Sequence, residues 1–394
     1  MKNILICKLN NGCYESTDFF ADQAAEELRK SDCEVTMFEW KKDGEAGLEK
    51  LFHVPFDAIL DFNSKLPRLK VDERPVVDYL NGPVYDWLLD HPLYHHDVLK
   101  NIASRHDFHV ICLDEGHAEY VRQWYPQVRS VHMMPLGGVE KNDMPWEKKK
   151  KDLIFCGTYV DPELIMSCIE KSPEEIRSAS LNMIEYLFQH PDSTVEKACR
   201  QYYESKECML KGAAFPLFMQ MNFLADTYVR AVYREQAVSL LLKEKIPAKI
   251  YGPGWEELAI KIGIDKNCFS GEISYKKSLE IQAEHGIVLN IMPWFKAGAH
   301  DRFFTAMSAG SLCLTDSSLY LEKYFREDID YAGYQLSSME SLPEKAQWLL
   351  DHTKQMQEIA LSGAEKVRSG HLWKNRMHIF QQILENEKQD TEKI

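Results

Sequence analysis

The stretch GIVLNIMPWFKAGAHDRFFTAMSAGSLCLTD, residues 286–316, decides the fold class. It begins with an apolar run at 287–291, which is typical of a buried parallel strand. Large apolar side chains then recur at helical spacing over 303–307, Gly310 ends this helix, and the apolar run at 312–315 predicts a second strand. Strand, loop, helix and strand in this order predict a βαβ unit of a parallel sheet.

Four polar residues gather where the predicted helix begins: Lys296, His300, Asp301 and Arg302. Backbone N–H groups and the helix dipole favour an anion at a helix N-terminus. A lysine and an arginine beside that point suit a diphosphate, so we predict an anion site there. In the alternative interpretation the unit is purely structural, and Arg302 caps the helix or pairs with a surface carboxylate.

The rest of the chain repeats this alternation. Further strands are predicted near 4–9, 34–40, 58–62, 84–89, 110–113, 131–134, 153–157, 248–251 and 268–270. The predicted fold is α/β, with two Rossmann-like, doubly wound parallel-sheet domains facing a cleft. We predict domains at 1–147 and 148–370, a linker at 141–151, an insertion of three to five helices at about 162–245, and a last helix within 371–394.

The 286–316 segment resembles the donor-binding unit of GT-B glycosyltransferases, in the CgeB-like branch of the bacterial group 1 transferases. The matching features are LN after the first strand, AHDR-FF-AM-AG on the helix, and LTD at the end of the second strand. Weaker resemblance extends over most of the chain through the segments DAILDFN, LLDHPLYHH, CLDEGHAEYV, MMPLGG and LIFCGTY. Many retaining relatives carry two glutamates eight residues apart, and here these positions are Ala297 and Thr305.

The resemblance implies a hexosyltransferase-like enzyme that moves a sugar from a nucleotide-sugar donor to a cell-surface polysaccharide, glycolipid or protein. It also implies that domain 1–147 binds the acceptor, that 148–370 binds the donor, that the segment from Gly271 to Ile273 contacts the nucleotide base, and that the final helix returns to the first domain. No cofactor and no metal are expected, because basic side chains and a helix N-terminus can stabilise the leaving diphosphate.

Ligands of open α/β sheets bind beyond the carboxyl ends of the strands, and this rule selects the remaining candidates. On the donor side these are Gly157, Thr158, Tyr159, Gly252, Gly254, Gly271, Ile273, Lys296, His300, Asp301, Arg302 and Thr305. On the acceptor side they are Asn11, Gly12, Asp114, His117 and Gly138. Tight turns explain many of these glycines equally well.

Asp90 and His91 follow a predicted strand and are the candidate catalytic residues, one of which would remove the acceptor hydroxyl proton. A metal site of Asp90, His91 and His95 is a second interpretation. In a third, Asp90 caps a helix that begins at Pro92, and Asp114 likewise caps the helix that contains His117.

The composition limits the possible partners and compartments. A net charge of −14 makes duplex nucleic acid an unexpected partner. The ten cysteines include no CxxC pair, which favours buried thiols of a cytoplasmic protein over disulfides or a zinc site. No signal peptide or membrane-spanning run is recognised, so we expect at most peripheral membrane contact.

Two other classes of function fit the same pattern. One is a nucleotide-sugar epimerase or hydrolase on the same scaffold. The other is a non-catalytic protein whose two lobes close on a ligand.

Overall fold

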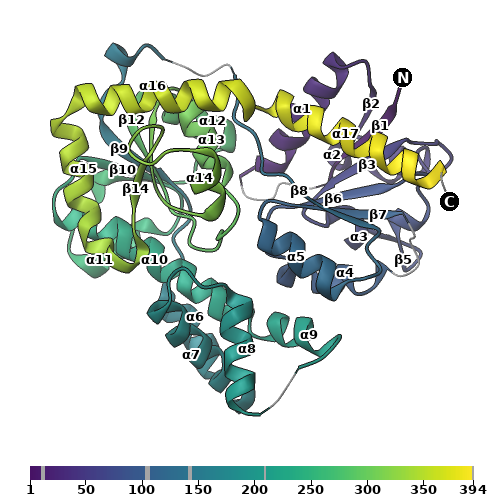
Figure 1. The fold of residues 1–394 in the computed structure, drawn as a ribbon, viewed down its shortest axis with the longest axis horizontal. Helices are drawn as coiled ribbons and strands as arrows, with labels where there is room; N and C mark the ends of the chain where they lie inside the picture. The colour runs from purple at the N-terminus through teal and green to yellow at the C-terminus, as the bar shows by residue number, and fades with distance from the viewer. Residues whose placement is uncertain (10–13, 103–106, 141–143, 208–209, 393–394) are drawn as a thin grey trace. The chain divides into compact units, whose positions relative to one another are not determined.

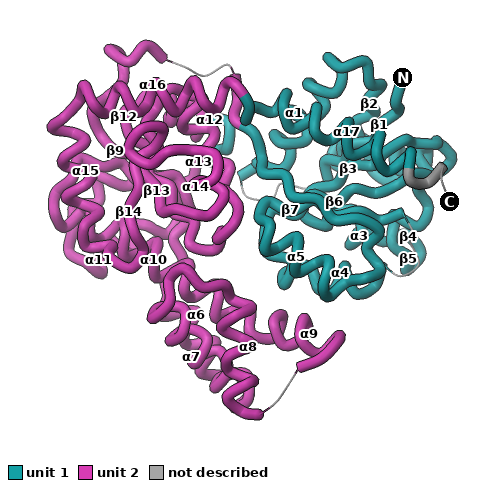
Figure 2. Tube along the Cα trace, viewed as in Figure 1, with its two compact units in different colours: residues 1–137, 274–276, 370–394 teal, residues 138–273, 277–369 magenta. Residues whose placement is uncertain are grey.

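The computed structural model describes residues 1–9, 14–102, 107–140, 144–207 and 210–392 (Figure 1). The chain divides into two compact units, coloured separately in Figure 2. Unit 1 comprises residues 1–137, 274–276 and 370–394, and unit 2 comprises residues 138–273 and 277–369. Each is an α/β unit built on a parallel sheet of six strands, as the alternating pattern predicted.

The sheet of unit 1 has the strand order β2-β1-β3-β6-β7-β8. Its strands are β1 (Asn3–Lys8), β2 (Glu34–Glu39), β3 (Ala58–Phe62), β6 (Val84–Leu88), β7 (Phe108–Cys112) and β8 (Ser130–Met133). Every residue of β3, β6 and β7 is buried. Central parallel strands are covered on both faces, which explains why they are apolar runs without alternation.

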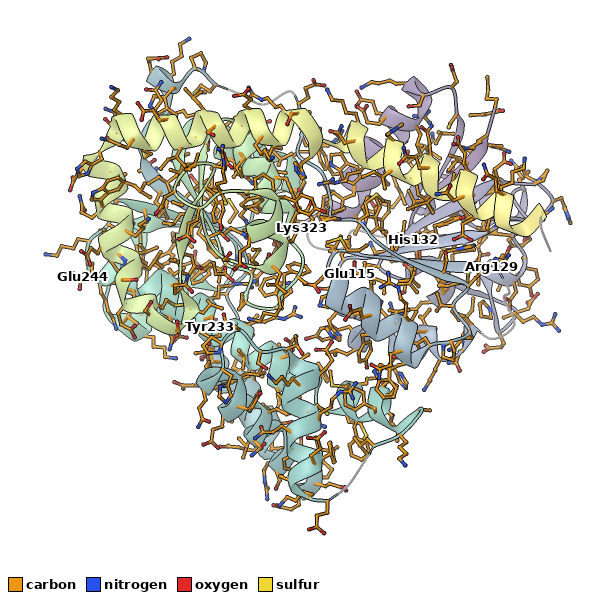
Figure 3. All side chains as sticks on the ribbon, in the orientation of Figure 1. Glu115, Arg129, His132, Tyr233, Glu244 and Lys323 are labelled. Atoms are coloured by element: carbon orange, nitrogen blue, oxygen red, sulfur yellow. The ribbon has the colours of Figure 1, made fainter. Side chains whose placement is uncertain are left out.

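Helices cover the sheet of unit 1. They are α1 (Ser16–Lys30), α2 (Trp40–Glu49), α3 (Lys65–Arg68), α4 (His96–Leu99), α5 (Glu115–Trp124) and α17 (Trp373–Glu392), with short 3-10 turns η1 (Val76–Asp78) and η2 (Pro92–His95) and a hairpin of β4 (Lys70–Val71) and β5 (Arg74–Pro75). The last helix, α17, packs on α1, where Trp373 stacks on Phe20 with ring centroids 5.8 Å apart. Its Glu387 also lies 3.3 Å from Nε2 of His132 on β8, a histidine marked in Figure 3.

The sheet of unit 2 has the order β11-β10-β9-β12-β13-β14. Its strands are β9 (Lys150–Cys156), β10 (Ala248–Tyr251), β11 (Phe269–Ser270), β12 (His285–Asn290), β13 (Leu312–Asp316) and β14 (Ala332–Tyr334). The helices outside the insertion are α11 (Trp255–Ile262), α12 (Tyr275–Glu284), α13 (Asp301–Ser308), α14 (Leu319–Tyr324), α15 (Leu342–Asp351) and α16 (Thr353–Gly370), with 3-10 turns η4 (Trp146–Lys148), η5 (Lys266–Cys268) and η6 (Leu336–Ser341).

The predicted insertion is a helical subassembly of unit 2. It contains α6 (Pro162–Glu170), α7 (Glu174–Gln189), α8 (Val195–Ser205), α9 (Ala214–Met221) and α10 (Phe223–Lys243), five helices among its described residues. Figure 1 shows α6, α7 and α8 running side by side. Tyr233 of α10, labelled in Figure 3, packs its ring 5.5 Å from that of Phe188 on α7. The long helix α10 therefore joins the insertion to the sheet that follows it.

The predicted linker at 141–151 is partly wrong, because β9 already begins at Lys150. Lys149 is buried, and its ammonium donates to the carbonyl oxygens of Ala283 and Ala309 at 2.5 and 2.9 Å and to the hydroxyl of Ser311 at 3.0 Å. These acceptors belong to other segments of unit 2, so Lys149 connects the start of β9 to these segments by hydrogen bonds. Residues 141–143 of the stretch lie outside the described residues.

The cysteines of the described residues are free, and six of these eight are buried. Within the same part of the chain, no helix is both long enough and apolar enough to cross a bilayer.

Candidate functional site

The order of the second sheet creates a topological switch point between β9 and β12. The strands after β9 add on one side of it, while β12, β13 and β14 add on the other. At such a point the connections leave in opposite directions and open a crevice at the carboxyl ends of the strands. The segments that follow β9 and β12 are therefore the expected ligand-binding part of unit 2.

Arg302 lies at this switch point. Its guanidinium carbon stands 5.2 Å from the ring centroid of Phe155 on β9, and Nη1 donates to the side-chain oxygen of Asn290, the last residue of β12, at 3.1 Å. The side chain is half-buried. A planar guanidinium held by one edge can present its remaining N–H groups to two oxygens of a ligand, which is a geometry that suits a phosphate.

The α13 helix begins at Asp301 because His300 is its N-cap. Nδ1 of His300 lies 3.2 Å from the backbone nitrogen of Arg302 and 2.7 Å from Oδ1 of Asp301. Burial lowers the pKa of His300, and the charges of Arg302 and Arg234 lower it further against the opposing effect of Asp301. The imidazole is therefore neutral near pH 7 and orders the helix entrance without adding a charge.

A buried carboxyl stands at the end of the neighbouring strand. Oδ1 of Asp316 accepts from the backbone nitrogen of Met292 at 2.8 Å and from the hydroxyl of Tyr334 at 3.4 Å, and that hydroxyl also lies 3.2 Å from the carbonyl oxygen of Asn290. Oδ2 of Asp316 is buried without a hydrogen-bond partner in the described part of the chain. Burial raises the pKa of Asp316 to about 6, and the Lys296 charge opposes this.

Two arginines of α10 reach the same region, and the sequence analysis missed both. The guanidinium carbons of Arg230 and Arg234 stand 4.7 and 5.6 Å from the ring centroid of Trp294. Arg234 also donates to the carbonyl oxygen of Thr158 at 3.1 Å, directly after β9. Their spacing of four residues within a helix was the available signal, because such residues share one helix face.

Lys296 is turned toward the insertion. Its ammonium donates to the carbonyl oxygen of Pro191, in the connection between α7 and α8. Its own carbonyl oxygen accepts from the backbone nitrogen of Leu319, where α14 begins. Lys296 therefore fixes the loop before α13 to two other segments, and its charge is felt by Asp316.

The glycines after β9 and β10 allow two backbone segments to approach closely. Gly252 has a φ of 128°, and a Cβ there would lie 2.2 Å from the carbonyl oxygen of Gly157. Gly254 has a φ of 86°, and its Cβ would lie 2.6 Å from the carbonyl oxygen of Tyr159. Since backbone fills these spaces, Gly252 and Gly254 shape the crevice by packing.

The remaining donor-side residues divide between structure and open surface. Tyr159 is buried, and its hydroxyl donates to Glu235 of α10 at 2.6 Å. A Cβ added to Gly271 would meet no described atom within 4 Å, and the carbonyl oxygen of this glycine accepts from the nitrogen of Gly252 at 3.1 Å. Ile273 is half-buried. The backbone near Gly271 is thus open to a ligand.

Two expectations need correction. Thr305 is buried and donates to Gln282 on α12 at 2.8 Å, so it braces α13 instead of facing the helix entrance. Gly138 was placed on the acceptor side but belongs to unit 2, where a Cβ would lie 2.9 Å from the carbonyl oxygen of Phe304 on α13. A side chain at this position would collide with the backbone of α13, so only glycine fits there.

In unit 1, His91 is the cap that had been assigned to Asp90. Nδ1 of His91 accepts from the backbone nitrogen of Leu93 at 2.9 Å, which caps η2. Asp90 instead accepts from the side-chain amide of Asn63 at 3.2 Å. His91 is buried, with its ring 4.5 Å from that of His117, whereas Asp90 is half-buried.

The other acceptor-side candidates are partly structural. Asp114 caps α5, accepting from the backbone nitrogens of Gly116 and His117 at 2.7 and 3.3 Å. Asn11 and Gly12 lie outside the described residues. No three His, Cys, Asp or Glu residues of the described segments are arranged to hold a metal ion, which leaves the set of Asp90, His91 and His95 without structural support.

The first sheet has its own switch point, between β1 and β3, and the sequence analysis overlooked it. Asn63 and Ser64 follow β3 there with φ values of 62° and 54°. Oδ1 of Asp86 accepts from the backbone nitrogen of Ser64 at 2.8 Å, and its Oδ2 accepts from the Ser64 hydroxyl at 2.5 Å. A buried carboxylate thus holds an uncommon backbone conformation at the point where a ligand is expected.

Comparison with protein families matches residues 231–383 to the family described as glycosyl transferase-like. The chain is similar to this family over that segment. The match begins in α10, so it includes Arg234 together with Asn290, Arg302 and Asp316. No curated protein sequence matches the chain significantly.

Solved structures of GT-B glycosyltransferases share its fold. Sucrose-phosphate synthase from Thermosynechococcus elongatus has a TM-score of 0.56 at 10% identity, covering 99% of this chain and 100% of the other. Anabaena Alr3699/HepE in complex with UDP and glucose has a TM-score of 0.53 at 11% identity, covering 98% and 100%. An alpha-glucosyltransferase in complex with UDP and a 13-mer DNA has a TM-score of 0.57 at 10% identity, covering 98% and 100%. Similarity at this level of identity shows the GT-B fold.

The expectation of a metal-independent reaction assumed that the chain has no obvious Asp-x-Asp pair, but it contains one, Asp328-Ile329-Asp330. Oδ1 of Asp330 lies 2.9 Å from Arg326 and accepts from the hydroxyl of Ser362 at 2.7 Å, while Asp328 lies 2.6 Å from Lys345. Cationic and hydroxyl groups thus already occupy these carboxylates, which precede β14 and not the switch-point strands.

Proposed function

We propose that this glycosyltransferase moves a sugar from a nucleotide-sugar donor held by unit 2 to a polysaccharide, glycolipid or protein acceptor. The observation that carries the proposal is the half-buried Arg302 guanidinium at the switch point of the second sheet, fixed between Phe155 and Asn290. The glycosyl transferase-like family match and the GT-B fold support it. Relatives of the same fold include complexes with UDP.

Arg302 binds the donor diphosphate in this proposal. It stands at the N-terminus of α13, where backbone N–H groups add to its charge. Arg234 lies close enough to affect His300 and extends the positive region from the α10 side. As the bond between the anomeric carbon and the diphosphate oxygen breaks, these cations stabilise the negative charge that develops on the leaving group.

Asp316 is suited to a hydroxyl of the donor. Its buried Oδ2 lacks a hydrogen-bond partner among the described residues, which is a costly arrangement that a ligand hydroxyl would relieve. The open backbone at Gly271 is the proposed contact for the nucleotide base, with Ile273 beside it.

If the reaction inverts the configuration of the anomeric carbon, Asp90 is the residue that removes the acceptor hydroxyl proton in this proposal. Its carboxylate is half-buried at the end of β6, while Nδ1 of His91 already accepts a backbone N–H group. The bond to the acceptor oxygen forms on the anomeric carbon, and the acceptor proton passes to Asp90. If configuration is retained, the leaving phosphate takes the proton and Asp90 orients the acceptor.

Turnover is expected without a divalent metal, because the leaving diphosphate is stabilised by arginine and the α13 N-terminus. Activity should persist in EDTA and should not rise when magnesium or manganese is added. Loss of activity in EDTA that either ion restores would refute this assignment of roles.

The test of the proposed function is incubation of the protein with a panel of nucleotide sugars, with and without bacterial glycan, glycolipid and protein acceptors. Release of UDP, GDP or TDP is the readout. The proposal requires release that depends on an acceptor. Equal release of the nucleotide without an acceptor would indicate a hydrolase. Isomerisation of the donor sugar without release of the nucleotide would indicate an epimerase. Binding of the nucleotide sugar without turnover would indicate a non-catalytic protein.

A further inference from the structure

A pocket of about 750 Å³ opens in unit 2 beside β14, the edge strand of its sheet. Its walls are the segment before β14, β14 itself and the helices α15 and α16. The volume is within the range of about 300–1,000 Å³ that is typical of small-molecule sites. Arg302, Asn290 and Asp316 do not line it, although Tyr334, whose hydroxyl contacts Asp316, does.

The charged side chains of this pocket are mostly acidic. They are Glu327, Asp328, Glu344, Glu358 and Lys345, so one positive and four negative groups give a net charge of −3. The single ammonium, that of Lys345, lies 2.6 Å from Oδ1 of Asp328. Glu358 lies 3.9 Å from the ammonium of Lys354, an exposed residue outside the pocket lining. Glu327 and Glu344 have no cation of the lining beside them other than Lys345, so the pocket keeps an acidic excess that favours a positively charged ligand.

The same pocket presents large apolar side chains to solvent. Trp348 is 43% exposed and Ile329 is 48% exposed, while Ile359 is buried in the wall. The Trp348 ring is held by stacking on His352 at 4.4 Å and 17°. An exposed tryptophan beside carboxylates suits an ammonium group on an apolar chain, because the ring face attracts the cation and the isoleucines cover the methylene groups.

The wall before β14 is already fixed in place. The guanidinium of Arg326 contacts Asp330 at 2.9 and 3.1 Å, and Ser362 of α16 donates to Asp330 at 2.7 Å. Gly363 packs against the carbonyl oxygen of Asp330, to which a Cβ would come within 2.2 Å. The pocket is thus held open by contacts of its own, which reduces the entropic cost of binding a ligand.

We propose that this pocket binds an aliphatic organic cation with two or more ammonium groups separated by methylene chains. An inorganic cation would leave the tryptophan and isoleucine surface unused, and a neutral apolar ligand would desolvate the carboxylates without compensation. The proposal does not depend on the transferase reaction, because it assigns no part in cation binding to Arg302, Asn290 or Asp316.

Calorimetric titration of the full chain with spermidine tests it, with an uncharged diol of similar length as the neutral probe. Spermidine should bind and the diol should not. The double variant Glu344→Gln/Glu358→Gln should weaken spermidine at least tenfold, and Trp348→Leu should weaken it severalfold. Glu365→Gln is the matched control, since Glu365 is an exposed carboxylate of α16 outside the pocket lining.

The proposal would be overturned if spermidine and the diol bound with equal affinity. It would also be overturned if the double variant changed the spermidine affinity by less than twofold, or if Glu365→Gln weakened spermidine as much as the double variant does. Tight binding of a lysine peptide together with no binding of spermidine would also reject a small-molecule site. Because these titrations contain no nucleotide sugar, they leave the transferase assay as a separate test.

Discussion

At the residue scale, Asp90 and His91, which follow β6, have different structural roles. Nδ1 of His91 accepts the backbone N–H of Leu93, so the proton of the neutral ring is on Nε2. Asp90 keeps a half-buried carboxylate beside Asn63. A cap and the proposed proton acceptor thus occupy adjacent positions.

Substitutions should separate these roles. His91→Ala should lower the free energy of unfolding by about 1 kcal/mol, as expected for a lost N-cap, whereas His91→Asn should largely retain it because asparagine caps well. Asp90→Asn should lower turnover about a hundredfold if it takes the proton, with unchanged nucleotide affinity. Chemical denaturation and steady-state turnover are the measurements. Full activity of Asp90→Asn would remove Asp90 from catalysis, and equal stability of the two His91 variants would remove the cap.

The residues found from the sequence are those with a local signature. The N-terminus of α13 was predictable because the residues that surround it are neighbours in the chain. Thr305 was misplaced since its partner, Gln282, is on another helix. Arg234 and Asp316 were missed because only the folded sheet brings them beside Arg302, and no spacing within the sequence records that proximity.

At the scale of elements, β9 begins inside a stretch that the sequence presents as a charged linker. A run of four lysines hides the start of the strand, and the lysine directly before β9, Lys149, is buried. Composition alone favoured a linker because lysine is usually exposed. The three acceptors of Lys149 come from segments more than a hundred residues away, which a local pattern does not contain.

Lys149→Met should therefore destabilise unit 2. The substitution leaves the carbonyl oxygens of Ala283 and Ala309 without their donor, at a cost of roughly 1–3 kcal/mol for each buried unsatisfied group. Denaturant unfolding monitored by tryptophan fluorescence measures it. Lys148→Met is the matched control, since Lys148 is exposed and should change the stability little. Equal effects of the two substitutions would contradict this structural role of Lys149.

At the scale of the whole molecule, the two sheets were predictable but their strand orders were not. Apolar runs show where the strands are. They do not show which strands pair, and pairing sets the order β2-β1-β3 in one sheet and β11-β10-β9 in the other. These orders set the switch points and therefore the positions of Asn63 and Arg302. The sequence consequently predicted the fold class and the two parallel sheets, but not where the switch point falls in each sheet.

Buried titratable groups also give the molecule a defined pH response. Burial raises the pKa of Asp86 to about 6 from 3.8. The folded state holds this proton more tightly than the unfolded chain, so the stabilisation is present below pH 3.8 and is lost as the pH rises through about 6. Burial lowers the pKa values of His95 and His109 to about 4, and these residues act in the opposite direction, reducing stability as the pH falls from 6.5.

Asp86→Asn isolates the carboxyl from these histidines. The melting temperature of the variant relative to the wild type should rise between about pH 4 and pH 6 and then stay level, because only the wild type acquires the buried charge of Asp86, whereas the neighbouring buried Asp61 is present in both proteins. Asp78→Asn, at an exposed site, should show no such trend. Thermal unfolding at several pH values is the measurement. A relative melting temperature that falls over this range would contradict the raised pKa of Asp86.

The central claim is that Arg302 binds the donor diphosphate at the switch point, and calorimetric titration with UDP and GDP tests it most directly. Whichever nucleotide binds the wild type, Arg302→Ala should weaken it by about 1.5–3 kcal/mol, the scale of a hydrogen bond to a charged group, which is roughly tenfold or more. Arg302→Lys should not restore it, because lysine lacks the two-pronged geometry. Arg177→Ala removes an insertion arginine paired with Glu174 and should leave the affinity unchanged. An unaltered dissociation constant in a folded Arg302→Ala variant would contradict the account.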